Sequence, residues 1–233
     1  MATHDSAWRR AQMTAADDGM RAYYAARAPH FDDIYTLPER QADLQWLTQY
    51  IPRVFTARRV LDVAAGTGFW TAGIAREASS VLAVDACPEP LERLEARGLG
   101  RHVQTAVHDA YALDTLGGFD AAFVGFWFSH VPRARRRAFC RGLDTALAPG
   151  SPVVFVDNLP GARHAIERVD DADDGWQTRT LPDGSRHQVL KNFPRPDEMF
   201  EALEGLASHT VWRELEHFWV FQYRTGACHA PSV

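Results

Sequence analysis

Short apolar runs alternate with amphipathic segments through the middle of the chain. The runs are rich in valine and other β-formers, as expected of strands that are buried on both faces of a parallel sheet. They comprise residues 60–63, 81–84, 103–107, 119–125 and 153–156. The segments between them include three with the apolar spacing of helices, at 69–78, 89–97 and 133–147. This alternation predicts an α/β fold built on a parallel sheet.

Further elements are predicted toward both ends of the chain. Ahead of the first strand, the segments 15–27 and 41–51 have helical spacing. After the fifth strand, two β-like segments flank Pro182, Asp183 and Gly184, which is typical of a hairpin turn. These segments are 176–181 and 186–193, and a helix at 197–206 and closing strands at 210–215 and 218–223 follow them.

The stretch 60–71 predicts a strand, a tight turn and a helix start. Gly66 and Gly68 allow backbone angles that are closed to other residues, so a ligand can lie against the main chain and near the first helical N–H groups. Dinucleotide-binding folds use the same device. Their fingerprint, however, has Gly or Ala where this chain has Thr71, and the carboxylate of Asp62 suits an ammonium group better than a pyrophosphate.

The segment from Asp62 to Gly68 resembles the first motif of class I S-adenosylmethionine-dependent methyltransferases, an acidic residue followed by a glycine-rich loop. Ala64 replaces the first glycine of that motif. The resemblance extends over residues 60–158 and points to the bacterial small-molecule branch. It implies a Rossmann-like three-layer sandwich whose seven-stranded sheet is mostly parallel, with the last strand antiparallel.

We expect one domain over residues 1–233. Within it, residues 1–55 form an N-terminal helical cap and 56–158 the cofactor-binding half. Residues 159–195 form a hairpin or lid insertion, and 196–233 a helix and closing strands.

Acidic residues also follow the second and third predicted strands. Asp85 stands where nucleoside-binding α/β folds accept hydrogen bonds from ribose hydroxyls. Asp109 is either a turn or cap residue or, as the resemblance implies, the acceptor for an adenine amino group. The resemblance implies S-adenosyl-L-methionine as cofactor, with Tyr24, Asp62, Ala64, Gly66, Thr67, Gly68, Asp85, Ala86, Asp109, Ala110 and Phe126 as its binding residues.

The N-terminal aromatic residues Tyr23, Tyr24, Phe31 and Tyr35 have two interpretations. They either pack a leading helix onto the domain or form the segment that closes over the cofactor in many small-molecule methyltransferases. In the same way, the hairpin is expected either as an arm over the acceptor site or at a dimer contact.

The fourth strand runs into an aromatic segment, 125–132, and lacks the Asn/Asp-Pro-Pro-aromatic motif of enzymes that methylate planar amino groups. Trp127 and Phe128 either wall a small acceptor or belong to the core. His130 is the candidate general base, with a structural role as the alternative. His187 and Lys191, together with Arg186, are candidates for binding an acceptor carboxylate, although charged hairpin edges are usually solvated.

Composition narrows the classes of partner. The chain has 233 residues, 46% of them hydrophobic, and a formal net charge of −5, which gives no general attraction to nucleic acid or to anionic membranes. The basic cluster of Arg133, Arg135, Arg136 and Arg137 favours the solvated start of a helix over a phosphate-binding patch. Cys87, Cys140 and Cys228 suggest neither a disulfide framework nor a zinc site, and the acidic stretch 170–174 lacks the ligands of a calcium loop.

Residues 1–12 contain no apolar signal core, and no apolar run reaches membrane-spanning length, so we expect a cytoplasmic protein without a metal. The sequence predicts methyl transfer to a small acceptor, through oxygen, nitrogen or a carboxylate, by a monomer or homodimer. Aromatic compounds and secondary metabolites are the candidate acceptors. A nicotinamide-dependent oxidoreductase and a non-catalytic S-adenosylmethionine-binding regulatory protein remain the alternatives.

Overall fold

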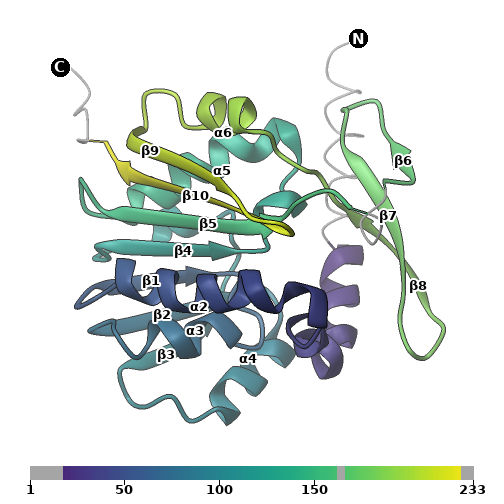
Figure 1. Cartoon of the computed structure of the whole chain (residues 1–233), viewed down its shortest axis with the longest axis horizontal. Coiled ribbons are helices and arrows are strands. Elements are labelled where there is room, and N and C mark those ends of the chain that lie inside the picture. The colour runs from purple at the N-terminus through teal and green to yellow at the C-terminus, as the bar shows by residue number, and fades with distance from the viewer. Residues whose placement is uncertain (1–17, 162–165, 227–233) are drawn as a thin grey trace.

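The computed structural model describes residues 18–161 and 166–226. Its main feature is a seven-stranded sheet with the strand order β3-β2-β1-β4-β5-β10-β9 (Figure 1). The first five strands are parallel, and β10 is antiparallel to both of its neighbours, β5 and β9. The strands are β1 (Arg59–Val63), β2 (Ser80–Asp85), β3 (Val103–Val107), β4 (Ala121–Gly125), β5 (Pro152–Asn158), β9 (Ala207–Glu214) and β10 (Phe218–Thr225). The expected fold class is confirmed.

Helices cover both faces of this sheet, because successive side chains of a buried strand point to opposite faces and both faces are apolar. Val60 packs toward α2 (Gln41–Val54) and α3 (Phe69–Ile74), with Leu47 and Ile74 among its neighbours in that cluster. The next residue, Leu61, packs toward α5 (Arg136–Thr145) and α6 (Pro196–Ala202). Leu91 and Leu94 of α4 (Pro88–Ala96) cover Ala83 of β2.

The order of strands reverses beside β1, which pairs with β2 on one side and with β4 on the other. Connections from the two sides therefore diverge and leave a crevice at the carboxyl ends of these strands, where α/β folds bind ligands. The topology alone thus places a site between the ends of β1 and β4.

A second, three-stranded sheet of β6 (Arg168–Val169), β7 (Gly175–Thr180) and β8 (Arg186–Leu190) forms an arm beyond the carboxyl end of β5 (Figure 1). The predicted turn is confirmed: Gly184 has a φ of +85°, and its N–H donates to the carbonyl of Leu181 over 2.9 Å. Apolar side chains of the arm pack on Met20 and Tyr23 from the helix at residues 18–27. The arm and this helix therefore lie side by side.

Several predicted boundaries shift. The helix α3 ends at Ile74 rather than at residue 78, because the following residues form tighter turns, with the N–H of Glu77 bonded to the carbonyl of Ile74. The helix α6 ends at Ala202 because Gly205, with a φ of +75°, turns the chain into β9. A 3₁₀ turn, η5 (Arg133–Arg135), precedes α5. The start of the predicted helix 15–27 lies outside the described residues.

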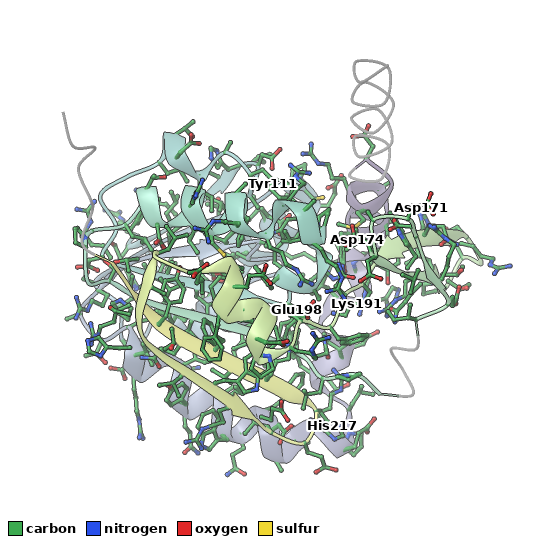
Figure 2. All side chains as sticks on the ribbon, turned by 90° about the horizontal axis from the view of Figure 1, so that it is seen from above. Tyr111, Asp171, Asp174, Lys191, Glu198 and His217 are labelled. Carbon is green, nitrogen blue, oxygen red and sulfur yellow. The ribbon has the colours of Figure 1, made fainter. Side chains whose placement is uncertain are left out.

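The basic cluster is not a solvated helix start, and that expectation is wrong. Arg136 is buried and lies 3.4 Å from Glu198, and Arg133 forms an ion pair with the same carboxylate. Arg137 donates to main-chain carbonyls of Glu201 and Glu204. The cluster thus joins the start of α5 to α6, whose acidic first turn supplies the compensating charge (Figure 2).

The acidic stretch 170–174 is also used internally. The buried carboxylate of Asp174 accepts hydrogen bonds from the main-chain N–H of Arg133 and from the side chain of Asn192. Cys87 and Cys140 are free and buried, and Cys228 lies outside the described residues. Within residues 18–161 and 166–226, no helix combines the length and apolar character needed to span a bilayer.

Candidate active site

A roofed cavity lies at the carboxyl ends of β1 to β4. The helix at 18–27 and the following 3₁₀ segment η1 (Ala28–Tyr35) form its roof. Ten of the residues predicted to bind cofactor or acceptor, or to act as base, line it together. They are Tyr24, Asp62, Ala64, Asp85, Ala86, Asp109, Ala110, Phe126, Trp127 and His130.

The glycine turn shapes one wall without lining the cavity itself. Gly66 and Gly68 have φ values of +57° and +78°, in the left-handed region where glycine is favoured. A Cβ atom at Gly66 would lie 3.1 Å from the ring of Phe31 in the roof, and one at Gly68 would lie 2.4 Å from Cγ of Leu94. Thr67 donates its hydroxyl to Oδ1 of Asp32 over 2.5 Å. The turn is therefore packed between α4 and the roof.

Two non-glycine residues of the cavity wall also have left-handed backbone. Ala64, at the position where the motif has glycine, has a φ of +54°, and Phe126, directly after β4, has a φ of +58°. Such angles cost free energy in residues with a Cβ atom and tend to occur at functional sites. The observed strain explains why the motif has glycine at the position of Ala64.

Asp62 lies at the base of the cavity with only 1% of its surface exposed. Its Oδ2 accepts a hydrogen bond of 2.6 Å from the hydroxyl of Thr71. Burial raises the pKa of Asp62 to about 7, although the Thr71 hydrogen bond opposes the shift. A cation placed beside Asp62 would offset the cost of ionising the buried carboxylate.

Asp85 is held at the end of β2 by main-chain donors. The N–H groups of Gly66 and Cys87 each donate to one carboxylate oxygen, both over 2.9 Å. Burial raises the pKa of Asp85 above its usual value, although these hydrogen bonds oppose the shift. Each oxygen can still accept at least one further hydrogen bond, so the carboxylate can receive a pair of hydroxyl groups.

Asp109, after β3, is bonded to the roof. Its Oδ1 accepts from the N–H of Tyr111 over 2.9 Å, as expected of a turn residue, and its Oδ2 pairs with the guanidinium of Arg21 over 3.1 Å. Arg21 is a cavity residue that the sequence analysis missed, because a single arginine on an amphipathic helix carries no signal. Cys87 and Tyr111 were missed as well, although their places shortly after Asp85 and Asp109 pointed to them.

His130 is buried and both of its ring nitrogens have partners. Nδ1 lies 2.6 Å from the carbonyl of Leu190, which can only accept, so Nδ1 carries the proton. Nε2 then accepts the hydroxyl of Tyr24 over 2.8 Å. Burial and, after it, the charge of Lys191 lower the pKa of His130 to about 3, so the imidazole is neutral at pH 7.

Three of the predicted acceptor-binding residues lie outside the cavity. Phe128 is buried in the core against Phe139 and Phe155. His187 packs its ring 5.5 Å from that of Tyr23, between the arm and the helix at 18–27. Lys191 is buried and paired with Asp157. Trp127, in contrast, lines the cavity.

The roof is attached to the domain on both sides of the glycine turn. Arg97, just after α4, pairs with Asp32 and donates from Nε to the carbonyl of Thr67 over 2.6 Å. Tyr35 stacks on Phe69 with a centroid distance of 3.8 Å. The N-terminal aromatic residues therefore both pack the leading segment onto the domain and cover the cavity.

Residues 60–150 match the family model described as a methyltransferase domain. A malonyl-[acyl-carrier protein] O-methyltransferase of Halorhodospira halophila is 30% identical over 190 residues, which cover 78% of this chain and 60% of the relative. A ubiquinone biosynthesis O-methyltransferase of Xanthomonas oryzae pv. oryzae is 32% identical over 147 residues, 60% of this chain and 58% of the relative. The chain thus spans about 60% of the length of these curated relatives.

Solved structures match nearly the whole chain. A structure of DhpI in complex with SAH is 28% identical, with a TM-score of 0.74 and coverage of 91% of this chain and 97% of that one. The 1,6-didemethyltoxoflavin-N1-methyltransferase of Burkholderia thailandensis is 16% identical with a TM-score of 0.62, covers 91% and 90% of the two chains, and shows the common fold. Together with the glycine turn and the strand-end carboxylates, these matches support the resemblance to class I S-adenosylmethionine-dependent methyltransferases of the bacterial small-molecule type.

Proposed function

We propose that this chain transfers a methyl group from S-adenosylmethionine to an oxygen of a small-molecule acceptor. The observation that carries the proposal is the convergence of Asp62, Asp85 and Asp109, from the ends of three adjacent strands, on one roofed cavity. The O-methyltransferase relatives support oxygen as the acceptor atom. The proposed reaction is the one expected of the bacterial small-molecule branch of the class I S-adenosylmethionine-dependent methyltransferases.

The cavity residues fit the cofactor group by group. Among residues 18–161 and 166–226, no cationic side chain pairs with Asp62, so the ammonium group would supply that charge, and Asp85 has free lone pairs for two ribose hydroxyls. Asp109 would accept the adenine amino group, in competition with Arg21. When bound, S-adenosylmethionine supplies an electrophilic methyl group on sulfur and leaves as a neutral thioether. The protein's task is then mainly to align the acceptor oxygen with that methyl group and to exclude water.

The acceptor would lie against Tyr24, Trp127 and His130, at the end of the cavity nearest the arm. His130 can hold the Tyr24 hydroxyl in place, but an imidazole with a pKa of about 3 is a weak base at neutral pH. This favours acceptor oxygens that are already ionised, such as carboxylates, because these need no base. We further propose that the protein acts in the cytoplasm, as a monomer or homodimer.

The test is a methyl-donor assay read by mass spectrometry, against a panel of small carboxylates, hydroxyl compounds, amines and thiols. We expect oxygen-methylated products, fastest with carboxylates, and loss of product in a folded Asp85→Ala variant. Products methylated only on nitrogen or sulfur would overturn the choice of atom. Calorimetry tests the oxidoreductase alternative, which tighter binding of reduced nicotinamide than of S-adenosylmethionine would favour. Binding of S-adenosylmethionine without turnover of any acceptor would favour a regulatory protein.

A further inference from the structure

Three consecutive residues at the end of the last arm strand, Leu190 to Asn192, hold the loop that carries His130. The carbonyl of Leu190 accepts from His130, and the N–H of Asn192 donates to the carbonyl of Ser129 over 2.7 Å. Between them, Nζ of Lys191 donates to the hydroxyl of Ser129 over 2.5 Å. The root of the arm therefore fixes both the position of the loop and the orientation of the imidazole ring.

Lys191 also forms a buried ion pair at this junction of the arm and the domain (Figure 2). Its Nζ lies 2.9 Å from Oδ1 of Asp157, and the two side chains are 2% and 0% exposed. Burial raises the pKa of Asp157, but the charge of Lys191, together with other neighbouring groups and the hydrogen bonds from Lys191 and Ser129, outweighs burial and lowers the pKa to about 2, so the carboxylate is ionised. Oδ2 of Asp157 accepts from the N–H of Ser129 over 3.1 Å. Lys191 and Asp157 thus both form hydrogen bonds with Ser129.

A buried ion pair seldom stabilises a fold more than apolar residues of similar size would, so its presence beside a functional loop calls for another reason. Three charged groups act on His130: Lys191, which follows β8, Asp157 of β5 and Arg179 of β7. The hydroxyl of Tyr24 in the roof is hydrogen-bonded to its ring. Lys191 and Arg179 disfavour an imidazolium, whereas Asp157 favours one. The Lys191 charge lowers the pKa of His130 by more than the Asp157 charge raises it.

We propose that Lys191 is a positioning residue, which fixes the loop through Ser129 and Asp157 and keeps His130 neutral with its proton on Nδ1. Nε2 is then always available to accept the Tyr24 hydroxyl at the cavity wall. This role differs from direct binding of an acceptor carboxylate, which the position of Lys191 on the hairpin had suggested. The significance for catalysis rests on the proposed function, but the state of His130 can be measured without turnover.

The test is NMR of the full chain with ¹⁵N-labelled histidine, because ¹⁵N shifts distinguish the two tautomers and the imidazolium. In the parent protein we expect a neutral Nδ1–H ring for His130 from pH 5 to pH 8. In Lys191→Met, the unpaired Asp157 carboxylate should raise the midpoint of His130 protonation by at least about one pH unit. The matched control Lys191→Arg keeps the charge and should keep His130 neutral.

A parent His130 that titrates above pH 5, or that carries its proton on Nε2, would overturn the proposal, and so would a Lys191→Met protein with an unchanged His130. If Lys191→Met does not fold, the double variant Lys191→Met with Asp157→Asn removes the pair without stranding a charge. It should lose the single Nδ1–H signal, and retention of that signal also contradicts the proposal. A rise in acceptor KM in Lys191→Met with an unchanged His130 spectrum would instead assign Lys191 to the acceptor.

If no acceptor is methylated while the NMR results are as expected, the proposed function fails and the positioning role stands. If methyl transfer is active, the Lys191→Met variant should show kcat falling toward acid pH, since protonated His130 no longer accepts the Tyr24 hydroxyl. The parent and Lys191→Arg should lack this acid limb.

Discussion

The hydroxyl of Tyr24 lies 2.8 Å from Nε2 of His130, although the two residues are 106 positions apart in the chain. This hydrogen bond joins the roof to the loop after β4, so the roof meets the wall of the cavity that Trp127 and His130 form. Burial raises the pKa of Tyr24 and lowers that of His130, which keeps both groups uncharged at neutral pH. The bond is therefore one between a neutral donor and a neutral acceptor.

Replacing Asp85 should weaken cofactor binding. Asp85→Ala removes the acceptor for the ribose hydroxyls and should cost about 1.5–3 kcal/mol of S-adenosylmethionine binding, measured by calorimetry. Asp114→Ala, which removes an exposed carboxylate outside the cavity, is the control and should bind as the parent does. Parental affinity in a folded Asp85→Ala protein would show that the ribose lies elsewhere.

Cofactor affinity should depend on pH through Asp62. Because its pKa is about 7 in the ligand-free protein, the carboxylate must lose a proton to meet an ammonium group below that pH. Affinity should rise with pH up to about 7 and then level off, with a slope approaching tenfold per pH unit on the acid side. In Asp62→Asn, binding should be weaker and this slope absent. A flat profile in the parent would contradict the assignment.

The raised pKa of Asp62 also makes the stability of the ligand-free protein depend on pH. Stability should fall as the pH rises, whereas cofactor affinity should increase. A carboxyl group whose pKa is raised by folding binds its proton more tightly in the folded state. Its contribution is therefore complete near pH 4 and is lost as the pH rises through 7. Thermal unfolding of the ligand-free protein should show a decline in Tm between pH 5 and pH 8 that is smaller in Asp62→Asn. Equal declines in the two proteins would assign the effect to other groups.

Replacing His130 should cost little whichever acceptor is used. Glutamine keeps much of the shape and hydrogen bonding but has no basicity, and an imidazole with a pKa of about 3 is itself a weak base. Turnover of His130→Gln should therefore fall by less than about tenfold with a carboxylate acceptor and with a hydroxyl acceptor. A loss of about 10²–10⁴-fold with the hydroxyl acceptor alone would instead make His130 the general base.

The roof should be released faster when its attachment beside the glycine turn is removed. Arg97→Ala deletes the ion pair with Asp32 and the bond to the carbonyl of Thr67. Since these groups are partly exposed, we expect dissociation of S-adenosylhomocysteine to accelerate by about 2- to 10-fold, as measured by stopped-flow fluorescence. Arg101→Ala, at an exposed position, serves as the control. An unchanged rate would mean that the roof does not limit release.

The roof and the arm should become protected together. The apolar cluster that joins Met20 and Tyr23 to Val189 makes their local opening cooperative. Hydrogen exchange should slow in residues 18–35 and 175–190 when S-adenosylhomocysteine and an acceptor bind. Slowing in one segment alone would contradict the coupling, and no change in either would leave both as scaffold.

The sequence predicts strands β1 to β5 and the carboxylates at their ends well, because these signals are local. Apolar runs specify β1 to β5, and Asp62, Asp85 and Asp109 follow strand ends that must meet at one edge of a parallel sheet. The roof, the arm and the start of α5 instead depend on contacts between segments that are distant in the chain. No local pattern places Lys191 against Asp157 or Arg21 against Asp109, and a basic run such as 133–137 looks the same whether its partners are water or α6.

The three-stranded sheet of the arm forms no ladder with the seven-stranded sheet in the part of the chain that is described. Substitutions in β7 and β8 therefore do not break the pairing of the strands that lead to Asp62, Asp85 and Asp109. Changes in the arm act on the cavity through the contacts with Met20 and Tyr23 of the roof and through the Leu190 to Asn192 junction. On this architecture, the arm can reshape the surroundings of Tyr24 and His130 while the central sheet keeps its register.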